Sequence, residues 1–300
     1  MITENILDII GNTPMISLKA MTGLDIFAKG EYLNPGGSIK DRVAKFMIEA
    51  AEARGDLRPG MTIMECTSGN TGIGIALVGV RKGYRVVIIM PENMSEERKK
   101  IIKSLGAELI LTKSSEYING AVCEVARQKA MDPNIFVVQQ FENPDNPLAH
   151  YKTTAVEIWN QMEGEIDIFV SGLGSGGTLE GIGRYIKERN PTAKIVAVEP
   201  KNVSALLGHE PGLHNIQGIG DGFIPKILDV SRIDEIVEVS DEDAIITTRQ
   251  LAKVQGILAG TSSGANVWAS IQIAKKYGKD KRIATVIPDR IERYFSTSLI

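Results

Sequence analysis

From about residue 60 onward, short runs of apolar and β-branched residues alternate with longer amphipathic segments. This alternation is typical of βαβ units, in which a helix connects two parallel strands. We expect strands at 62–66, 85–90, 108–112, 135–139, 167–171, 194–199 and 282–287. Each run is nearly continuous in apolar residues, as expected where helices cover both faces of a sheet. The pattern therefore predicts an α/β protein with mainly parallel sheets.

The strongest cluster of turn-forming residues is segment 141–147, which reads Phe-Glu-Asn-Pro-Asp-Asn-Pro. It separates three strand and helix units before it from another set after it. A chain of 300 residues, 43% of them hydrophobic, is long enough for two cores. We therefore place a domain boundary in this segment. Ser38 is expected to cap a helix that runs to about Arg54.

The charges argue against several classes of protein. The 34 basic and 37 acidic residues give a net charge of −3 and form no basic stripe, so we expect no nucleic-acid partner.

No membrane segment is expected either. Apolar runs such as 86–90 are far shorter than the roughly 20 residues that cross a bilayer. The first ten residues carry Glu4 and Asp8 and lack a basic region, which favours a cytoplasmic protein.

The two cysteines, Cys66 and Cys123, are too few for a disulfide framework. No CxxC or paired-histidine spacing accompanies them, so no metal site is expected. We expect both to be buried thiols.

The segment 171–178, Ser-Gly-Leu-Gly-Ser-Gly-Gly-Thr, lies directly between an expected strand and an expected helix. Glycines let the backbone approach an anion, and a helix N-terminus offers free N–H groups, so this loop predicts a phosphate cradle. Two alternatives stay open. Gly172, Gly174 and Gly177 also match a dinucleotide fingerprint, with Glu199 placed to bind a ribose. The loop could also be a tight turn without a ligand.

Three further loops have similar composition. The segment 67–72, Thr-Ser-Gly-Asn-Thr-Gly, follows a strand and is rich in hydroxyl and amide groups that suit a carboxylate. The segments 217–222 and 260–264 are also glycine-rich. Four such loops exceed what simple turns require, although any one of them could be structural.

Segment 34–42, Asn-Pro-Gly-Gly-Ser-Ile-Lys-Asp-Arg, gives these loops a common context. Together with segments 67–72, 140–144, 174–178 and 218–220, it closely resembles the cysteine synthase and cystathionine β-synthase family of fold type II pyridoxal-phosphate enzymes. The likeness runs from Ile10 to Tyr294. It implies two three-layer α/β/α domains: a smaller mobile domain at 37–147 and a larger cofactor-binding domain formed by 1–36 and 148–300. It also implies a homodimer acting on small amino acids.

The resemblance implies roles for single residues. Lys40 would form the Schiff base with the cofactor, and Asn70 would contact the cofactor's ring hydroxyl. The phosphate would be held by Gly174, Ser175, Gly176, Gly177 and Thr178. The substrate carboxylate and amine would be held by Thr67, Ser68, Gly69, Thr71, Gln140 and Gly220. Independently of the family, burial lowers a lysine pKa, which suits Lys40 as a covalent anchor and base.

The implied reaction is β-replacement through an aminoacrylate, starting from L-cysteine or an O-activated L-serine. L-cysteine would release hydrogen sulfide and give serine, lanthionine or cystathionine. The alternatives are a biosynthetic O-acetylserine sulfhydrylase that uses sulfide, a nicotinamide-dependent dehydrogenase, and a catalytically idle amino-acid sensor.

Two aspartates depart from the family pattern. Asp289 lies where the partner of the cofactor's ring nitrogen is expected, so it either binds that nitrogen or turns outward toward Arg290 or Arg293. Asp221 stands between glycines where cysteine synthases generally carry a small residue. A carboxylate there would repel hydrosulfide. We expect Asp221 to act as a base for water or to pair with the ammonium group of a second amino acid, unless it is an inert loop residue.

Overall fold

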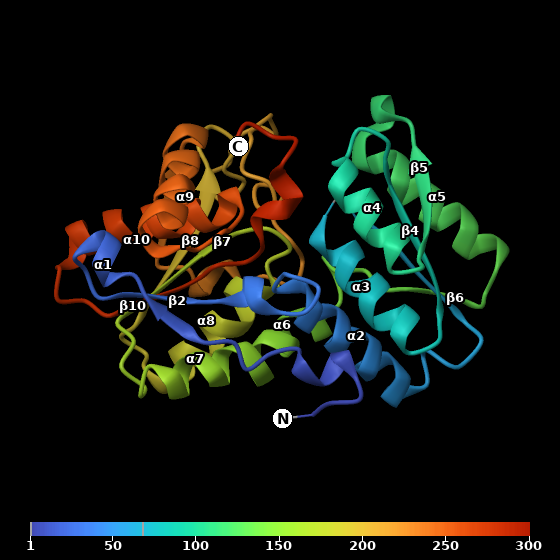
Figure 1. Ribbon diagram of the computed structural model, residues 1–300, viewed down its shortest axis with the longest axis horizontal. Coiled ribbons are helices and arrows are strands. Elements are labelled where there is room, and N and C mark those ends of the chain that lie inside the picture. The colour runs from blue at the N-terminus through green and yellow to red at the C-terminus, as the bar shows by residue number, and fades with distance from the viewer. Residues whose placement is uncertain (1, 68) are drawn as a thin grey trace.

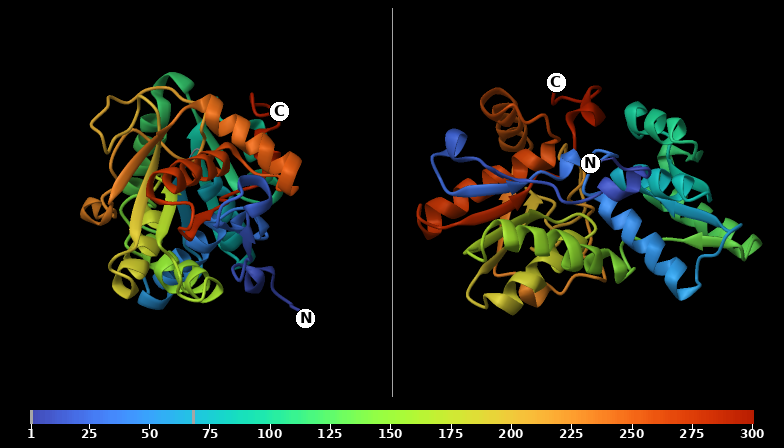
Figure 2. Two further views of the ribbon diagram at one scale, coloured as in Figure 1. Left: turned by 90° about the vertical axis from the view of Figure 1, so that its left-hand side faces the viewer. Right: turned by 60° about the horizontal axis from the view of Figure 1, so that its bottom comes forward.

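The computed structural model describes residues 2–67 and 69–300, and it consists of two lobes that lie side by side (Figures 1 and 2). Each lobe is a sheet with helices on both faces, which confirms the expected α/β class. All strand pairs are parallel except β1 with β2.

The larger lobe is built on a six-stranded sheet of order β1-β2-β10-β7-β8-β9. Its strands are β1 (Met15–Ser17), β2 (Ile26–Lys29), β7 (Ile168–Gly172), β8 (Lys194–Pro200), β9 (Glu235–Val239) and β10 (Ile283–Val286). Its helices are α1 (Lys19–Thr22), α6 (Asp145–Ala149), α7 (Ala155–Gln161), α8 (Gly177–Arg189), α9 (Asp241–Gln255) and α10 (Thr261–Tyr277). Ile168 and Val170 pack with residues of α9 and α10, whereas Phe169 between them packs with α7 and α8. Successive strand residues point to opposite faces, so the sheet is covered on both.

The smaller lobe is built on a four-stranded parallel sheet of order β5-β4-β3-β6. Its strands are β3 (Thr62–Cys66), β4 (Arg85–Pro91), β5 (Glu108–Thr112) and β6 (Ile135–Val137). Its helices are α2 (Lys40–Arg54), α3 (Asn70–Arg81), α4 (Glu96–Ser104) and α5 (Tyr117–Met131). Ile63 packs with α2 and α3, whereas Met64 packs with α5 on the other face.

Helix α2 connects the two lobes. Its apolar face belongs to the core of the smaller lobe, as does Leu7 from the N-terminal segment. On its other side, Arg42 forms hydrogen bonds with the buried Glu31 at 2.7 Å and with Glu157 at 2.6 Å, both in the larger lobe. Buried, bidentate arginine pairs of this kind fix geometry strongly, so the start of α2 is tied to the larger lobe.

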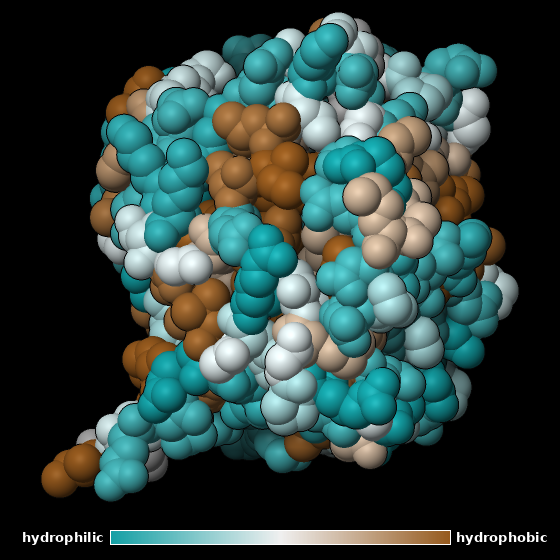
Figure 3. All heavy atoms as spheres, turned by 90° about the vertical axis from the view of Figure 1, so that its right-hand side faces the viewer, coloured by the Kyte–Doolittle hydropathy of each residue, from teal (hydrophilic) through white to brown (hydrophobic). Residues whose placement is uncertain are grey.

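Some local expectations were wrong. Ser38 does not cap α2 in the usual way, because Ile39 is the N-cap residue, although the Ser38 hydroxyl accepts a hydrogen bond from the amide of Lys40 at 3.2 Å. Cys123 is exposed on α5 rather than buried, and Cys66 is partly buried. Within the described residues, no helix is long and apolar enough to span a membrane. Seen from the side of the smaller lobe, hydrophobic residues gather in the upper middle of a mixed surface (Figure 3).

Candidate active site

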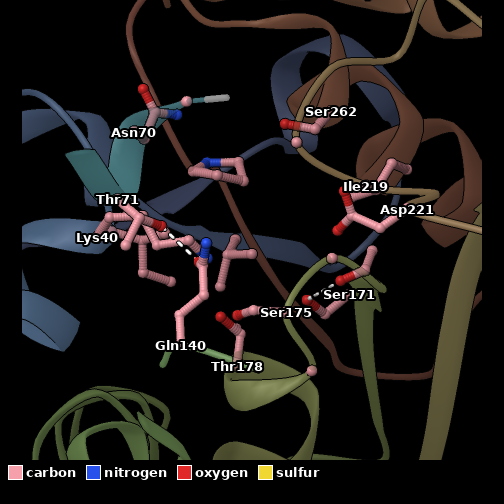
Figure 4. Close-up of a pocket in the computed structure, with 18 of the residues that line it drawn as sticks. Lys40, Asn70, Thr71, Gln140, Ser171, Ser175, Thr178, Ile219, Asp221 and Ser262 are labelled. Carbon is pink, nitrogen blue, oxygen red and sulfur yellow. Dashed lines mark hydrogen bonds between the residues drawn. The ribbon is translucent and has the colours of Figure 1, made fainter. Parts of the chain in front are cut away.

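A cavity lies between the lobes, and side chains from both lobes point into it (Figure 4). Lys40 and Thr71 lie on one side and Asp221 and Ile219 on the opposite side, while Ser175 and Thr178 lie at the N-terminus of α8. The cavity is lined by Ile39, Lys40, Thr67, Gly69, Asn70, Thr71, Gln140, Phe141, Ser171, Gly172, Gly174, Ser175, Gly176, Thr178, Gly218, Ile219, Asp221, Ser262, Asn266, Val286 and Pro288. Most of the residues expected at the site therefore meet in one place.

Lys40 is the first residue of α2, and its backbone is held from two directions. The amide of Ile39 donates to the carbonyl of Pro288 at 2.8 Å, so the preceding segment pairs with the C-terminal segment. On the other side, α3 approaches so closely that a Cβ on Gly74 would lie 2.7 Å from the Lys40 carbonyl oxygen. Burial lowers the pKa of Lys40, against the opposing charges of Asp221 and Asp289. A lysine in this state gives up its proton more readily than an exposed one.

The loop that connects β3 to α3 forms the wall beside Lys40. Thr67 is buried and its hydroxyl accepts the amide of Gly69 at 3.2 Å. The Thr71 hydroxyl donates to Oε1 of Gln140 at 2.6 Å, which brings Gln140 to the same wall. Ser68, also expected here, lies outside the described residues. The wall presents neutral donors at a helix N-terminus, which suits a carboxylate.

Gln140 is positioned by Glu65, a buried residue that sequence reasoning missed. A carboxylate oxygen of Glu65 accepts the amide of Gln139 at 2.7 Å, and the amides of Val138 and Gln140 also stabilise this carboxylate. Burial outweighs these bonds and raises the pKa of Glu65 to about 7. Gln139 has a left-handed backbone, with φ of 59°, and β6 ends at Val137 instead of continuing to 139 as expected.

Residues 174–178 form a cradle at the N-terminus of α8. Gly176 has a φ of 87°, which favours glycine. A Cβ on Gly174 would lie 2.3 Å from the carbonyl oxygen of Gly218, and one on Gly177 would lie 2.0 Å from Oδ1 of Asn146. Only glycine therefore fits at these positions. Gly177 does not itself line the cavity, whereas Ser175 and Thr178 do.

Asp289 neither lies in the cavity, where it could reach a ring nitrogen, nor turns outward to solvent. It is 1% exposed, so it does not turn outward toward Arg290 or Arg293, and it does not line the cavity. Its Oδ2 accepts hydrogen bonds from Nδ2 of Asn70 and from the hydroxyl of Tyr294, both at 2.7 Å. Asp289 therefore lies behind Asn70 and orients it.

Asp221 lines the cavity opposite Lys40. Surrounding protein raises its pKa, while the nearby charges of Lys40 and His214 act in the opposite direction. Its side chain nevertheless remains exposed to solvent, so water reaches the carboxylate. Gly220 does not line the cavity, because its backbone, with φ of 74°, packs against Pro200 and His214.

Three further residues complete the site. Ser262, in the first turn of α10, and Asn266, one turn later, both line the cavity. Asn266 Oδ1 accepts a hydrogen bond from the amide of Gly172 at 2.8 Å and so fixes the end of β7. The glycine-rich segment 260–264 was the only signal for Ser262.

Arg98 of α4 makes a contact between the lobes beside the cavity. It hydrogen-bonds to Gln217, beside the loop that carries Asp221, and its guanidinium lies 5.4 Å from the centre of the Tyr294 ring.

The dinucleotide interpretation of the cradle has no support in the geometry. Glu199, which would bind a ribose, is buried and accepts the amides of Ala205 and Leu206, both at 3.1 Å, as well as the hydroxyl of Ser204. Over residues 2–67 and 69–300, no cluster of histidine, cysteine and acidic side chains could hold a metal ion.

The arrangement fits an aldehyde cofactor that carries a phosphate. The cradle of small residues at the start of α8 suits the phosphate, and Lys40, with its lowered pKa, suits the aldehyde. Asn70 Oδ1 is buried and has no hydrogen-bond partner among the described residues, so the cavity offers an unused polar group to a ring substituent. Ser262 adds a hydroxyl at the end of the cavity that lies away from Thr178 of the cradle (Figure 4).

Comparisons with known proteins agree with this fit. The family model described as pyridoxal-phosphate dependent enzyme matches residues 6–289. A cysteine synthase from Staphylococcus aureus is 49% identical over 300 residues, covering 99% of this chain and 96% of the relative. The structure of a cysteine synthase from Entamoeba histolytica has a TM-score of 0.95 and 43% identity, covering 100% of this chain and 91% of that one.

A third relative is a hydrogen sulfide-producing enzyme, solved as an Asp-to-Asn variant in complex with an α-aminoacrylate intermediate. It has a TM-score of 0.92 and 39% identity, covering 98% of this chain and 90% of that one. The fold and site thus define a fold type II enzyme of β-replacement. The chain belongs to the family of pyridoxal-phosphate dependent enzymes.

Proposed function

We propose that this enzyme takes L-cysteine as its first substrate, releases hydrogen sulfide, and adds water or a second amino acid at Cβ under the control of Asp221. The observation that carries the proposal is the position of Asp221, whose carboxylate lines the cavity opposite Lys40 and stays open to water. A carboxylate there disfavours an incoming hydrosulfide anion by like-charge repulsion.

The residues of the cavity divide between cofactor and substrate. In the proposal Lys40 attaches the cofactor, the loop 174–178 holds its phosphate, and Asn70 meets its ring hydroxyl. Ser262, rather than Asp289, supplies the hydroxyl for the ring nitrogen, because Ser262 lines the cavity and Asp289 does not. Thr67, Ser68, Gly69, Thr71 and Gln140 hold the substrate carboxylate, and the backbone beside Gly220 faces the substrate amine.

The cofactor supplies an electron sink that makes the Cα proton acidic. Lys40, with its lowered pKa, accepts that proton at Nζ. The Cβ–S bond of cysteine then breaks, and the sulfur leaves as hydrosulfide with the one proton it carried. Asp221 accepts a proton from water while the water oxygen bonds to Cβ, and Lys40 returns its proton to Cα. Asp221 then releases its proton to solvent, where hydrosulfide takes up one and becomes hydrogen sulfide. The balance is cysteine plus water giving serine plus hydrogen sulfide.

The same position of Asp221 also suits a second amino acid. Its carboxylate would pair with the ammonium group of an incoming cysteine or homocysteine. The sulfur of that amino acid bonds to Cβ while its thiol proton passes to solvent, and Lys40 returns its proton to Cα, which gives lanthionine or cystathionine. The raised pKa of Asp221 favours the role of base, because a carboxylate with a higher pKa takes up a proton more readily.

A second candidate function is synthesis of cysteine from an O-activated serine and sulfide. Its support is the 49% identity to a protein named cysteine synthase. The two are separated by offering L-cysteine alone, or O-acetylserine with sulfide, and identifying every product. Serine or lanthionine together with sulfide from cysteine supports the first proposal. Turnover of O-acetylserine with sulfide and none of cysteine supports the second.

The role of Lys40 has its own test. Borohydride reduction followed by digestion should attach the cofactor to the peptide that contains Lys40. Label on another lysine would refute the assignment.

We further propose a homodimer that works in the cytoplasm, with residues 37–147 as a mobile unit that closes over the cavity. Closure is supported by Arg98, which bridges from α4 to Gln217 of the other lobe. Closure of this kind excludes bulk water from a reactive site. A monomer mass in light scattering would refute the dimer.

A further inference from the structure

A short helical segment lies directly behind the cradle and presents two side chains to it. Helix α6 (Asp145–Ala149) continues into η4 (His150–Thr154), a π-helical turn, and the two segments run against α8. Asn146 and His150 are four residues apart, so they share a face. Asn146 contacts Ser175, and His150 contacts Thr178, the two hydroxyl residues of the cradle. Both Asn146 and His150 are fully buried.

The direction of the Asn146 contact follows from its other partner. Asn146 Nδ2 donates to the carbonyl oxygen of Gln140 at 2.8 Å, and a carbonyl can only accept. The same Nδ2 lies 3.1 Å from Oγ of Ser175, so Asn146 donates its second proton there. The Ser175 hydroxyl thus receives a hydrogen bond from behind, and its own proton is free to point into the cavity.

His150 stands in the same relation to Thr178. Its Nε2 lies 3.3 Å from Oγ1 of Thr178, and its Nδ1 lies 3.0 Å from Oγ1 of Thr154. Burial and the charges of Lys40 and Arg42 hold the pKa of His150 well below 6.5, so the ring is neutral and one nitrogen carries the proton. Two directions of the chain of hydrogen bonds are therefore conceivable.

The ligand selects between the two directions. Phosphate oxygens without protons only accept, so Thr178 must donate to them, and its oxygen is left to accept from behind. Nε2 then carries the proton, and Nδ1 accepts from the Thr154 hydroxyl. We infer that His150 is a positioning residue for the phosphate: as its Nε2–H tautomer it donates to Thr178 and directs the Thr178 hydroxyl proton at the bound phosphate. This rests on the proposed role of loop 174–178 as the phosphate site.

The tautomer can be read without any variant of His150. The chain has three histidines, His150, His209 and His214, so ¹⁵N resonances of the holoenzyme are assigned by His209→Gln and His214→Gln variants. We expect His150 to be neutral with the proton on Nε2. A proton on Nδ1, or a doubly protonated ring, would overturn the inference.

A second measurement compares binding of pyridoxal phosphate and of pyridoxal to the apo form of the full chain. His150→Met removes the donor, and we expect it to weaken binding of pyridoxal phosphate about three- to tenfold while pyridoxal is unaffected. His150→Gln retains an amide donor and should restore most of the loss. A purely structural role would weaken both ligands alike, and that result would contradict the inference.

Thr178→Val separates this inference from the proposed site. If Thr178→Val weakens pyridoxal phosphate selectively and His150→Met does not, the cradle stands and the role of His150 is wrong. If Thr178→Val leaves the preference for pyridoxal phosphate over pyridoxal intact, the proposed use of the cradle itself fails.

Discussion

Asn70 donates a hydrogen bond from Nδ2 to Oδ2 of Asp289 at 2.7 Å, across 219 positions of the sequence. Asn70 opens α3 in the smaller lobe, and Asp289 follows β10 in the larger lobe. The same oxygen accepts the hydroxyl of Tyr294. One buried carboxylate therefore joins both lobes behind the cavity and sets the orientation of Asn70.

Replacing Asp289 with alanine should destabilise the protein and alter the cofactor environment. Two buried donors, on Asn70 and Tyr294, would lose their acceptor, and each such loss costs about 1–3 kcal/mol. We expect the free energy of unfolding in urea to fall by about 3 kcal/mol and the cofactor's absorption band to shift, because Asn70 is no longer held. Asp289→Asn keeps one acceptor oxygen and should lose less. An Asp289→Ala variant with unchanged stability and spectrum would refute this role.

Glu65 should make stability fall as pH rises toward neutrality. Its pKa is raised from 4.5 to about 7 in the folded protein. The folded state therefore binds the proton more tightly than the unfolded state, and the stabilisation present below pH 4.5 is lost as pH rises through about 7. The loss amounts to at most about 3 kcal/mol.

The check is the free energy of unfolding between pH 4.5 and pH 7.5 for the wild type and Glu65→Gln. We expect the variant to show a shallower decline with pH, because the titrating group is gone. Glu116, exposed at the start of α5, is a matched control, and Glu116→Gln should keep the wild-type slope. Equal slopes for wild type and Glu65→Gln would show that Glu65 does not titrate in this range.

Arg98 should affect substrate affinity more than the chemical step. Arg98→Met removes the bond to Gln217 and the contact with the Tyr294 ring, both of which hold α4 against the larger lobe. We expect KM for the amino acid to rise about fivefold to tenfold with kcat changed much less. Lys100→Met, on the same helix but exposed, should behave as the wild type. A fall in kcat with unchanged KM would argue against a closing role.

Much of the fold could be predicted because each buried parallel strand is a nearly continuous run of apolar residues in the sequence. Seven runs of apolar residues became strands, since a strand covered on both faces needs apolar residues throughout. The strands β1, β2 and β9 were not predicted. Both β1 and β2 are only 3–4 residues long, and β9 reads Glu-Ile-Val-Glu-Val, with no continuous apolar run.

The site was predictable where a motif carries a backbone requirement, as in the glycines of the cradle. Asp289 and Glu65 were misjudged or missed for a different reason. Each binds partners far away in the sequence, and sequence spacing carries no information on such pairs. Ser262 was missed because a hydroxyl in a glycine-rich turn resembles many ordinary turns.

The most direct test of the proposed function is the time course of sulfide release from L-cysteine alone, in the wild type and in Asp221→Asn. Departure of the thiol precedes the step in which Asp221 acts on the incoming nucleophile. The account predicts that the variant releases one sulfide per active site as fast as the wild type and then turns over about 100-fold more slowly. Steady-state sulfide production at the wild-type rate, with the same products, would contradict it.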